Sequence, residues 1–531
     1  MVPVSEAWKV KQADRLAPEG FVEIRYWVTE PGIQGEAEAT ANSSAYYANP
    51  RQLTDLSKGS VPRYATLERH LWALDGTMDL MPASNYGDTG YVSASVSEDS
   101  TGFQTLPTIT LSMDGIRHGT LPGLSIRWGE GYGDYPTSFR ISAYQGGTLI
   151  AQRTIEDNRE MESFVEVDMA GYDRITVEIL SWCLPSRRAR VEEIRLGLVQ
   201  RITKNQLMGF THEQSVDLLS GSLPKNAITF HLDNTLDQWN PENPMGLSRY
   251  LLERQELKVR YGLDIDGEIE WVDAGTFYLS EWQTPANGME ATFVARDLIG
   301  HMGKAYTGIR SGTLFDIALA AILEAELPTN EAGEVQYFLD PSVKDVSVDF
   351  TEDDTEYTIP ELLQLVANAG RCILYQNRQG QLRMEPHRSV YDGYAITKHV
   401  SYTHPEYVIT KPLGAVDVNS GLKVAIFNSS GETQTINNPL IQTSYQANEV
   451  ASWAAQYLKD RKVISGTFRA DPRLDALDTI AVESKYGTNQ AVVVTDLIYT
   501  FSGAFHGKFT GRVVEFEPDF AYSGELFTNE R

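Results

Sequence analysis

The chain of 531 residues has few cysteines, few basic side chains and no long apolar run. One disulfide between Cys183 and Cys372 is arithmetically possible. The two lie far apart in apolar surroundings, so we expect two buried free thiols instead. The longest apolar stretches, such as 317–323, fall far below the roughly 18 residues of a membrane-spanning helix. The opening residues 1–15 have no apolar run after their charges, which predicts no signal peptide, synthesis in a cytoplasm and no integral membrane segment.

Basic side chains are in deficit, with 45 Lys and Arg against 72 Asp and Glu, which gives a net charge of −27. No local basic stripe offsets this balance, so the chain should repel nucleic acid and anionic membrane surfaces. We therefore predict no sequence-specific nucleic-acid binding. The content of 42% apolar and 22% charged residues is typical of globular proteins, and the length suggests about three or four domains.

The usual catalytic and metal-binding patterns are also missing. His212-Glu213 begins a zinc-protease pattern, but Val216 stands where the second histidine ligand is needed, and there is no Cys-x-x-Cys. The glycines at 129–133 precede no helix that could bind a phosphate, and residues 503–508 lack the Walker spacing. We predict no catalytic, cofactor-binding or metal-ligating residues. A pair of acidic residues acting as in a glycosidase stays open as an alternative. With 72 carboxylates, many pairs would lie within reach by chance, so the sequence pattern does not discriminate.

Strand patterns dominate what is present. An alternating strand is predicted at 21–29, and a series of short strands with polar turns favours an antiparallel β-sandwich. The predicted strands of this series are 108–113, 124–128, 139–144, 148–154, 163–168, 174–181 and 191–199. A strand at 227–232 and two hairpins, turning at Asp266-Gly267 and at 285–288, resemble parts of a small barrel.

Helical patterns appear later in the chain. The first predicted helix begins after Thr313 and is stopped by Pro328; the second has Thr358 as its cap, Pro360 in its first turn and Gly370 at its end. A hairpin at 372–385 follows the second helix, which predicts an α+β domain over about 300–400. A third helix is predicted near 448–461, ahead of strands at 464–468, 479–484, 491–501 and 508–517.

The two β-rich sections end alike. Residues 293–296 read Phe-Val-Ala-Arg after one hairpin, and residues 509–512 read Phe-Thr-Gly-Arg after another. This similarity suggests an internal repeat of two related barrels.

Aromatic residues in the sandwich offer one candidate binding feature. Trp128 and Trp182 lie on predicted strands and are expected in the core. Tyr132 and Tyr135 lie in the loop 129–136 and are the better candidates for exposed contacts with sugar rings.

Several blocks of the sequence from about 200 onward resemble the tail hub proteins of bacteriophages, a family of baseplate hub and tail-associated proteins shared with related injection machines. They cover about three-fifths of the chain and comprise SVDLLSGSLPKNAITFHLDN (215–234), WNPENP (239–244), LERQELKVRYGLDIDGEIEW (252–271), residues 358–386, NNPLIQT (437–443) and residues 450–484. Residues 36–199 depart from the hub pattern and look like the carbohydrate-binding-module type of jelly roll.

The resemblance implies a mainly β fold class with an α+β portion and five segments. These are a first hub β-barrel (1–35 plus 200–300), an inserted β-sandwich (36–199), an α+β domain (301–404), a second barrel with one helix (405–517) and a C-terminal tail (518–531).

In function, the resemblance implies a structural, non-enzymatic protein of the virion tail. Three copies would form a homotrimeric ring around the channel for tape measure protein and DNA. The distal tail protein and tail tube would lie above this ring, and tip or fibre proteins below it. One alternative is a tail-tip protein that binds host cell-surface glycan, and a second is a cell-wall glycan hydrolase.

Overall fold

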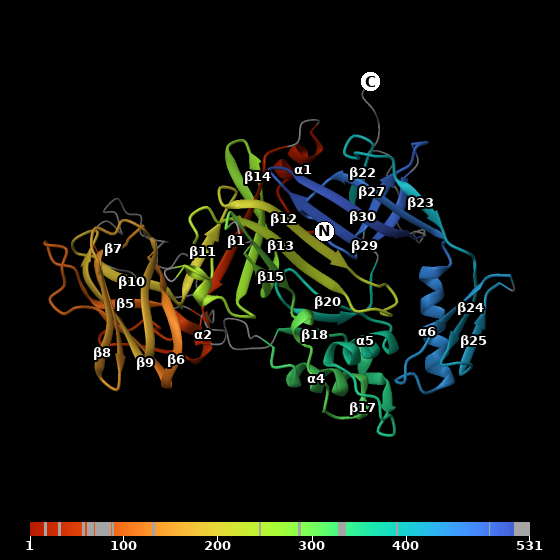
Figure 1. Ribbon diagram of the computed structural model, residues 1–531, viewed down its shortest axis with the longest axis horizontal. Coiled ribbons are helices and arrows are strands. Elements are labelled where there is room, and N and C mark those ends of the chain that lie inside the picture. The colour runs from red at the N-terminus through yellow and green to blue at the C-terminus, as the bar shows by residue number, and fades with distance from the viewer. Residues whose placement is uncertain are drawn as a thin grey trace, which may run out of the picture.

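The computed structural model describes residues 1–14, 18–29, 33–55, 59–60, 68, 86–87, 90–129, 133–243, 246–284, 288–327, 336–388, 391–428, 430–487 and 489–514. The fold is mainly β with an α+β portion, as predicted. Figure 1 shows a β-rich part at one end, a large sheet in the centre, and the helices α4 (Leu314–Glu324), α5 (Ile359–Ala369) and α6 (Ser444–Leu458) below and beside it. The predicted tail 518–531 lies outside the described residues.

The large central sheet has thirteen strands. Along its main path they are β11 (Leu198–Ile202), β1 (Gly20–Val28), β14 (Glu256–Ile265), β15 (Glu268–Gln283), β16 (Glu290–Arg296), β13 (Lys225–Asp233), β12 (Leu207–Ser215), β29 (Asn489–Phe501), β30 (Phe505–Val513), β27 (Lys462–Arg469) and β23 (Glu406–Ile409). Off this path, β28 (Thr479–Glu483) pairs with β29 and with β22 (Tyr391–Ile396). One buried apolar cluster contains side chains from β11 at one end of the path to β27 near the other, and none from the terminal strand β23.

The sheet consists of two halves with the same strand order. We call β1 with β12–β16 the first half, and β22, β23 and β27–β30 the second half. Numbered by their place along the chain, the strands of each half follow the order 1-4-5-6-3-2 across the sheet. The halves meet where β12 pairs antiparallel with β29. They differ at one end, since β1 pairs antiparallel with β14 whereas β22 pairs parallel with β28.

The register of the hairpins repeats as well. In the first half Arg296 faces Tyr278, and a bulge follows at Ser280. In the second half Arg512 faces Val493, and the matching bulge falls at Thr495. The two Phe-x-x-Arg segments noticed in the sequence therefore occupy equivalent places, each on the sixth strand of its half.

The inserted part forms a seven-stranded sheet with its own buried core. Its strands are β5 (Tyr91–Val96), β10 (Arg188–Leu196), β6 (Thr108–Trp128), β9 (Glu162–Trp182), β7 (Pro136–Gln145), β8 (Thr148–Ile155) and β2 (Glu38–Ala41). The insert leaves after β1 and returns at β11, which pair with each other at Val28 and Leu198. Its two ends are therefore adjacent, and the first half can fold around them.

Two pairs of predicted strands are single strands in the structure. Residues 108–113 and 124–128 both belong to β6, and residues 163–168 and 174–181 both belong to β9. The β6–β9 ladder continues through the predicted turns by shifting register, and Gly115 and Gly171 adopt positive φ values of 90° and 71° there. Such bulges bend a ladder without ending it.

The predicted helix caps are present. Thr313 and Asp316 form a capping box at the start of α4, and Thr358 and Glu361 form another at the start of α5. Gly370 ends α5, as expected. Helix α1 (Glu6–Ala13), capped by Ser5, was not predicted from the sequence. The short helices α2 (Ile33–Glu36) and α3 (Gln52–Asp55) flank β2, and the short strands β3 (Gly59–Ser60) and β4 (Tyr86–Gly87) pair with each other.

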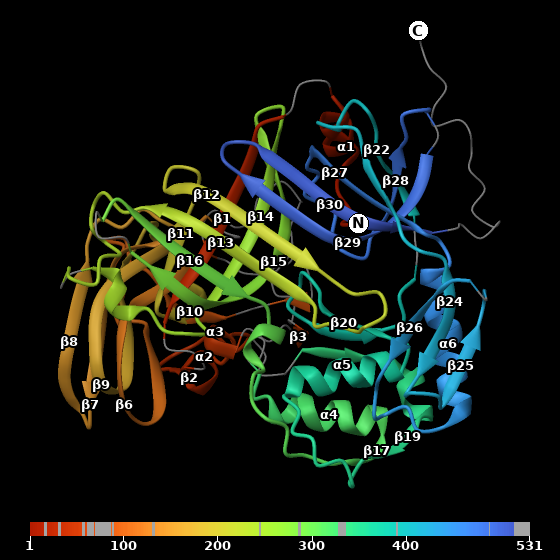
Figure 2. The same cartoon turned by 45° about the vertical axis from the view of Figure 1, so that its right-hand side comes forward.

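The α+β part contains more of the chain than the sequence suggested. Around α4 and α5 lie the strands β17 (Ser311–Thr313), β19 (Ser347–Asp349), β18 (Tyr337–Leu339), β20 (Ile373–Gln376) and β21 (Leu382–Glu385). The same apolar cluster includes α6 and the sheet of β24 (Leu413–Val418), β25 (Lys423–Ile426) and β26 (Glu432–Ile436) (Figure 2). The sequence grouped these residues with the second barrel, whereas their apolar faces pack on α5 and its neighbours.

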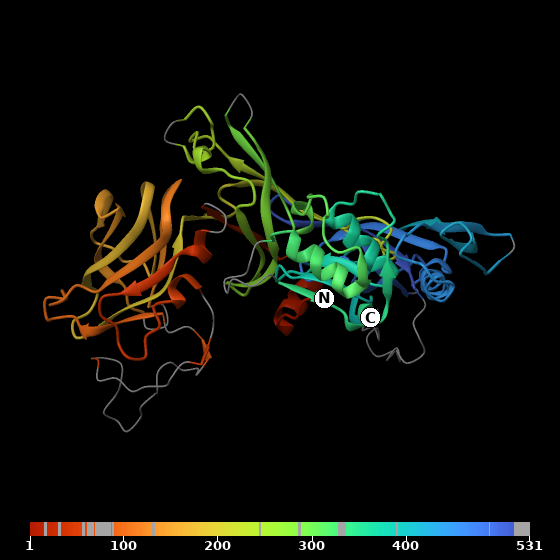
Figure 3. The same ribbon diagram turned by 90° about the horizontal axis from the view of Figure 1, so that it is seen from below.

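Figure 3 shows the long dimension of the molecule, with the inserted part at one end and β24–β26 at the other. Both cysteines are free thiols, as predicted; Cys372 is buried and Cys183 is half-buried. Among the described helices, none combines the length and the apolar character needed to cross a bilayer.

Candidate functional site

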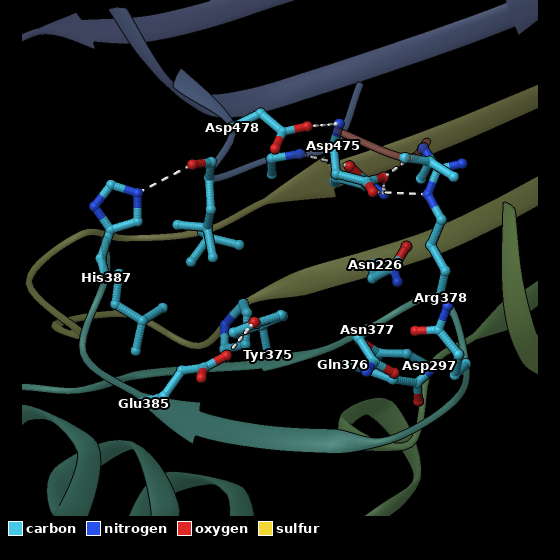
Figure 4. Close-up of a pocket in the computed structure, with 18 of the residues that line it drawn as sticks. Asn226, Asp297, Tyr375, Gln376, Asn377, Arg378, Glu385, His387, Asp475 and Asp478 are labelled. Atoms are coloured by element: carbon cyan, nitrogen blue, oxygen red, sulfur yellow. Dashed lines mark hydrogen bonds and ion pairs between the residues drawn. The ribbon is translucent and has the colours of Figure 1, made fainter. Parts of the chain in front are cut away.

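The two halves of the large sheet and the α+β part meet at one arginine. Arg378 lies in the turn between β20 and β21 and is buried. Its guanidinium donates to both carboxylate oxygens of Asp475, at 2.7 and 2.9 Å. It also donates to the backbone carbonyl of Asp273 in the first half and to those of Pro472 and Leu474 in the second half. One side chain of the α+β part therefore ties both halves together (Figure 4).

The charge of this arginine is well compensated. Burial alone would lower the pKa of Arg378, but the adjacent Asp475 carboxylate outweighs burial and holds that pKa above its usual range. A guanidinium presents five N–H donors in a fixed planar fork, which suits several acceptors around one point. The arrangement ties three parts of the chain together at one point.

A cavity of about 510 Å³ adjoins Arg378. Its lining comes from all three parts and includes Asn226, Asp297, Tyr375, Glu385, His387 and Asp478 (Figure 4). The Tyr375 hydroxyl donates to Glu385 at 2.6 Å, and Asp478 accepts from the amino group of Met1 at 2.7 Å. The Tyr375–Glu385 bond lies within the β20–β21 hairpin, and the Asp478–Met1 bond joins the second half to the N-terminus, so these polar groups make structural contacts where the parts meet.

Asp297 is the least satisfied group in this lining. It is buried, its Oδ1 accepts from the Gly300 backbone N–H at 3.2 Å, and no described group donates a hydrogen bond to its Oδ2. Burial raises the pKa of this carboxyl to about 7, although the backbone N–H groups of Gly300 and Ile299 lower it in part. The folded protein therefore binds the Asp297 proton more tightly than the unfolded chain does.

Stability should consequently fall as the pH rises from about 4 to above 7, because unfolding releases this proton in that window. Asp297→Asn keeps the Oδ1 acceptor and removes the charge. We expect it to raise the free energy of unfolding by on the order of 2–4 kcal/mol at pH 8 and by much less at pH 4. Urea unfolding at the two pH values measures this, with the exposed Asp345→Asn as control. A gain that is the same at both pH values would contradict the prediction.

The histidine considered in the sequence as part of a zinc-protease pattern is not among the residues that line this cavity. His212 is buried in the sheet core, with Nδ1 2.7 Å from the Tyr261 hydroxyl and Nε2 2.8 Å from Asn226 Oδ1. Burial lowers its pKa to about 4, so it is a neutral core histidine with both ring nitrogens satisfied. Among the described residues, no group of three or more His, Cys, Asp or Glu side chains is arranged to hold a metal ion.

The aromatic candidates lie in the inserted part. Trp128 and Trp182 are fully buried, as expected of core residues. Tyr135 is half-buried against the core of the insert, and its backbone N–H donates to Cys183 Sγ at 3.4 Å. Tyr132 lies outside the described residues. A sugar-contact role for the two tyrosines stays a prediction.

The edge of the large sheet at β23 is a second candidate site, which the sequence did not predict. The terminal strand β23 is apolar and exposed; Tyr407, Val408 and Ile409 are 41, 60 and 64% exposed. Exposed apolar edge strands invite pairing with another strand, so natural proteins normally cover or charge them. The segment is only four residues long, and its sequence Glu-Tyr-Val-Ile does not alternate between polar and apolar residues, so no periodic signal marks it as a strand.

No protein-family model matches the chain, and no curated protein matches it. Several solved structures are similar to it. The 43 kDa tail protein of prophage MuSo2 from Shewanella oneidensis is 12% identical, with a TM-score of 0.41 over 60% of this chain and 95% of that one. A tail protein from Neisseria meningitidis is 13% identical, with a TM-score of 0.40 over 60% and 93%. An Escherichia coli type VI secretion component, described as similar to T4 bacteriophage tail proteins, is 9% identical, with a TM-score of 0.36 over 60% and 75%.

Proposed function

We propose that this chain is a structural tail hub of a phage or phage-like particle, in which three copies form a ring that joins the tail tube to the tail tip. The observation that carries the proposal is the repeated strand order of the two halves, joined side by side in one sheet. Two similar halves in one chain allow three copies to present six similar units, and so to match a sixfold tube above and a threefold tip below.

The contact between the halves supports a ring. Strand β12 of the first half meets β29 of the second, so the contact joins two different surfaces. Contacts of this head-to-tail kind generate closed rings or open filaments when they are repeated between copies. The exposed strand β23 is the place where such a repeat can continue.

The ring would surround the channel for tape measure protein and DNA, with the distal tail protein and tail tube above and tip or fibre proteins below. A net charge of −27 supports this arrangement, because a negative channel wall reduces DNA adhesion by like-charge repulsion. The rigid three-way junction at Arg378 would hold the two halves at one fixed angle, as a load-carrying ring requires.

The oligomeric state tests the proposal. Native mass spectrometry or mass photometry of the full chain should give a species three times the 59.2 kDa of one chain. Cryo-electron microscopy of that species should show a ring with a central pore. A strictly monomeric protein at all concentrations, together with one copy per assembled tail, would overturn the proposal.

A further inference from the structure

The contact between β12 and β29 defines how the two halves recognise each other. Their antiparallel register places His212 opposite Tyr499, Glu213 opposite Ile498 and Gln214 opposite Leu497. Just beyond β12, the backbone N–H of Val216 donates to the Thr495 carbonyl at 2.8 Å. In an antiparallel pair, every second residue of a strand forms backbone hydrogen bonds to the same neighbouring strand. The backbone N–H and C=O groups of residues 212, 214 and 216 therefore point towards β29.

Strand β23 is the second-half counterpart of β12. Each is the second strand of its half and pairs antiparallel with the third, β13 for β12 and β27 for β23. The repeated registers make Tyr407 equivalent to His212, Val408 to Glu213 and Ile409 to Gln214. His212 is only 1% exposed, whereas its counterpart Tyr407 is 41% exposed, and no described strand covers the outer edge of β23.

The hydrogen bonds of β23 leave its outer edge available. The N–H of Thr410 donates to the Arg461 carbonyl at 2.8 Å, just past the pairing of β23 with β27. By the alternation of a strand, Val408 also bonds towards β27, and the backbone groups of Tyr407 and Ile409 point to the open side.

The end of β15 is the first-half counterpart of the β29 segment that receives β12. Leu279 exchanges backbone hydrogen bonds with Arg254 and Gln255, as Val494 does with Leu477 and Asp478. Arg254 and Leu477 share positive φ values of 66° and 77°, so the two turns match in conformation. Beyond this point β29 receives β12.

No second strand among the described residues pairs with the corresponding residues of β15. Glu281, Trp282 and Gln283 pair with β16 on one side only, and all three are exposed. Within the described part of the chain, β12 therefore pairs with β29, whereas their counterparts β23 and the end of β15 each have one free edge.

We propose that β23 of one copy pairs antiparallel with the end of β15 in a neighbouring copy, in the register of β12 on β29. The pairing rests on the proposed trimeric function and names the surfaces that make it. It places Ile409 opposite Trp282 and Val408 opposite Gln283. The N–H of Lys411 would donate to the Ser280 carbonyl, as the N–H of Val216 donates to the Thr495 carbonyl within one chain. The exposed apolar side chains of Ile409 and Trp282 then cover each other, a cross-strand pair of a favourable kind.

A cysteine pair tests the register. Val408 and Gln283 would form a non-hydrogen-bonded pair, with Cα atoms about 4.5 Å apart, within the roughly 4.4–6.8 Å of a disulfide. The full-length double variant Val408→Cys/Gln283→Cys, oxidised with copper phenanthroline, should give covalent dimers and trimers on non-reducing gels. Wild type, with native Cys183 and Cys372, measures the background.

The matched control is Val408→Cys/Glu281→Cys, which slips the register by two residues on the same face. The cysteines would then be diagonal, with Cα atoms about 7–8 Å apart and beyond the usual range of a disulfide, so crosslinking should be on the order of tenfold weaker. A trimer by native mass in which both pairs crosslink equally, or neither does, would overturn this strand pairing and leave the trimeric function standing. A chain that stays monomeric would overturn the trimeric function itself.

Discussion

Replacing Ile409 with proline is expected to separate the assembled copies while each chain stays folded. Proline has no backbone N–H, and the N–H of Ile409 is one that points away from β27. The change therefore removes a donor of the proposed contact and none of the bonds between β23 and β27. We expect about a tenfold or larger rise in the dissociation constant of each contact, which is about 1.4 kcal/mol or more. Mass photometry over a dilution series measures it.

The matched control is Ile426→Pro. Ile426 lies on β25, an edge strand of another sheet, and is 74% exposed. The Phe427 N–H donates to the Gly414 carbonyl, so by alternation the Ile426 N–H points outward, like that of Ile409. This variant should assemble as wild type does. Equal loss of assembly in both variants would indicate a general effect of proline and would contradict a specific role for β23.

Replacing Arg378 with alanine should lower the free energy of unfolding by more than replacing an arginine in an exposed ion pair. The variant leaves Asp475 without its cation and removes the Arg378 donor from the carbonyls of Asp273 and Pro472, all at the junction of three parts. The Leu474 carbonyl keeps the Tyr499 hydroxyl as a donor at 2.8 Å. Breaking a fully buried pair by removing one partner typically costs about 3–5 kcal/mol. The Asp475 side chain is 28% exposed, so water compensates part of its charge, and we expect a loss of about 3 kcal/mol, at the low end of that range. Urea unfolding followed by circular dichroism and by tryptophan fluorescence measures the loss.

Arg371→Ala provides the comparison. Arg371 follows α5, is 41% exposed at its side chain, and pairs with Glu449 at 2.7 Å. Exposed pairs of this kind contribute about 0–1 kcal/mol. A similar small loss for both variants would show that Arg378 does not hold the junction.

Local signals gave much of the secondary structure. The hairpin at Asp266-Gly267 was predictable because both residues adopt positive φ, 56° and 98°, which these residue types tolerate. The capped helices α4 and α5 were predictable for a similar reason, since capping residues act within one turn of the chain. The continuous strands β6 and β9 were not, because the sequence marks bends and turns with the same polar residues and glycines.

The candidate sites were harder to predict. Arg378 lies in a hairpin turn, where an arginine normally faces water. Its partners Asp273 and Asp475 are 105 and 97 residues away in the chain, and no local pattern connects them. Strand β23 is short, and it pairs with β27 on one side while no described strand pairs with its other side. Only the strand order of the full sheet reveals this free edge.

The sequence by itself determined the β-rich class, the helix caps, the main hairpins and the similarity of two Phe-x-x-Arg segments, since each depends on residues close together in the chain. Only the tertiary structure decided that the two halves share one sheet, that α6 and β24–β26 pack with α4 and α5, and that β23 is left open. The physical reason is that strand pairing and apolar packing join residues hundreds of positions apart. Which strand or apolar face a segment packs against depends on the folded surface around it, and local sequence carries no signal for that partner.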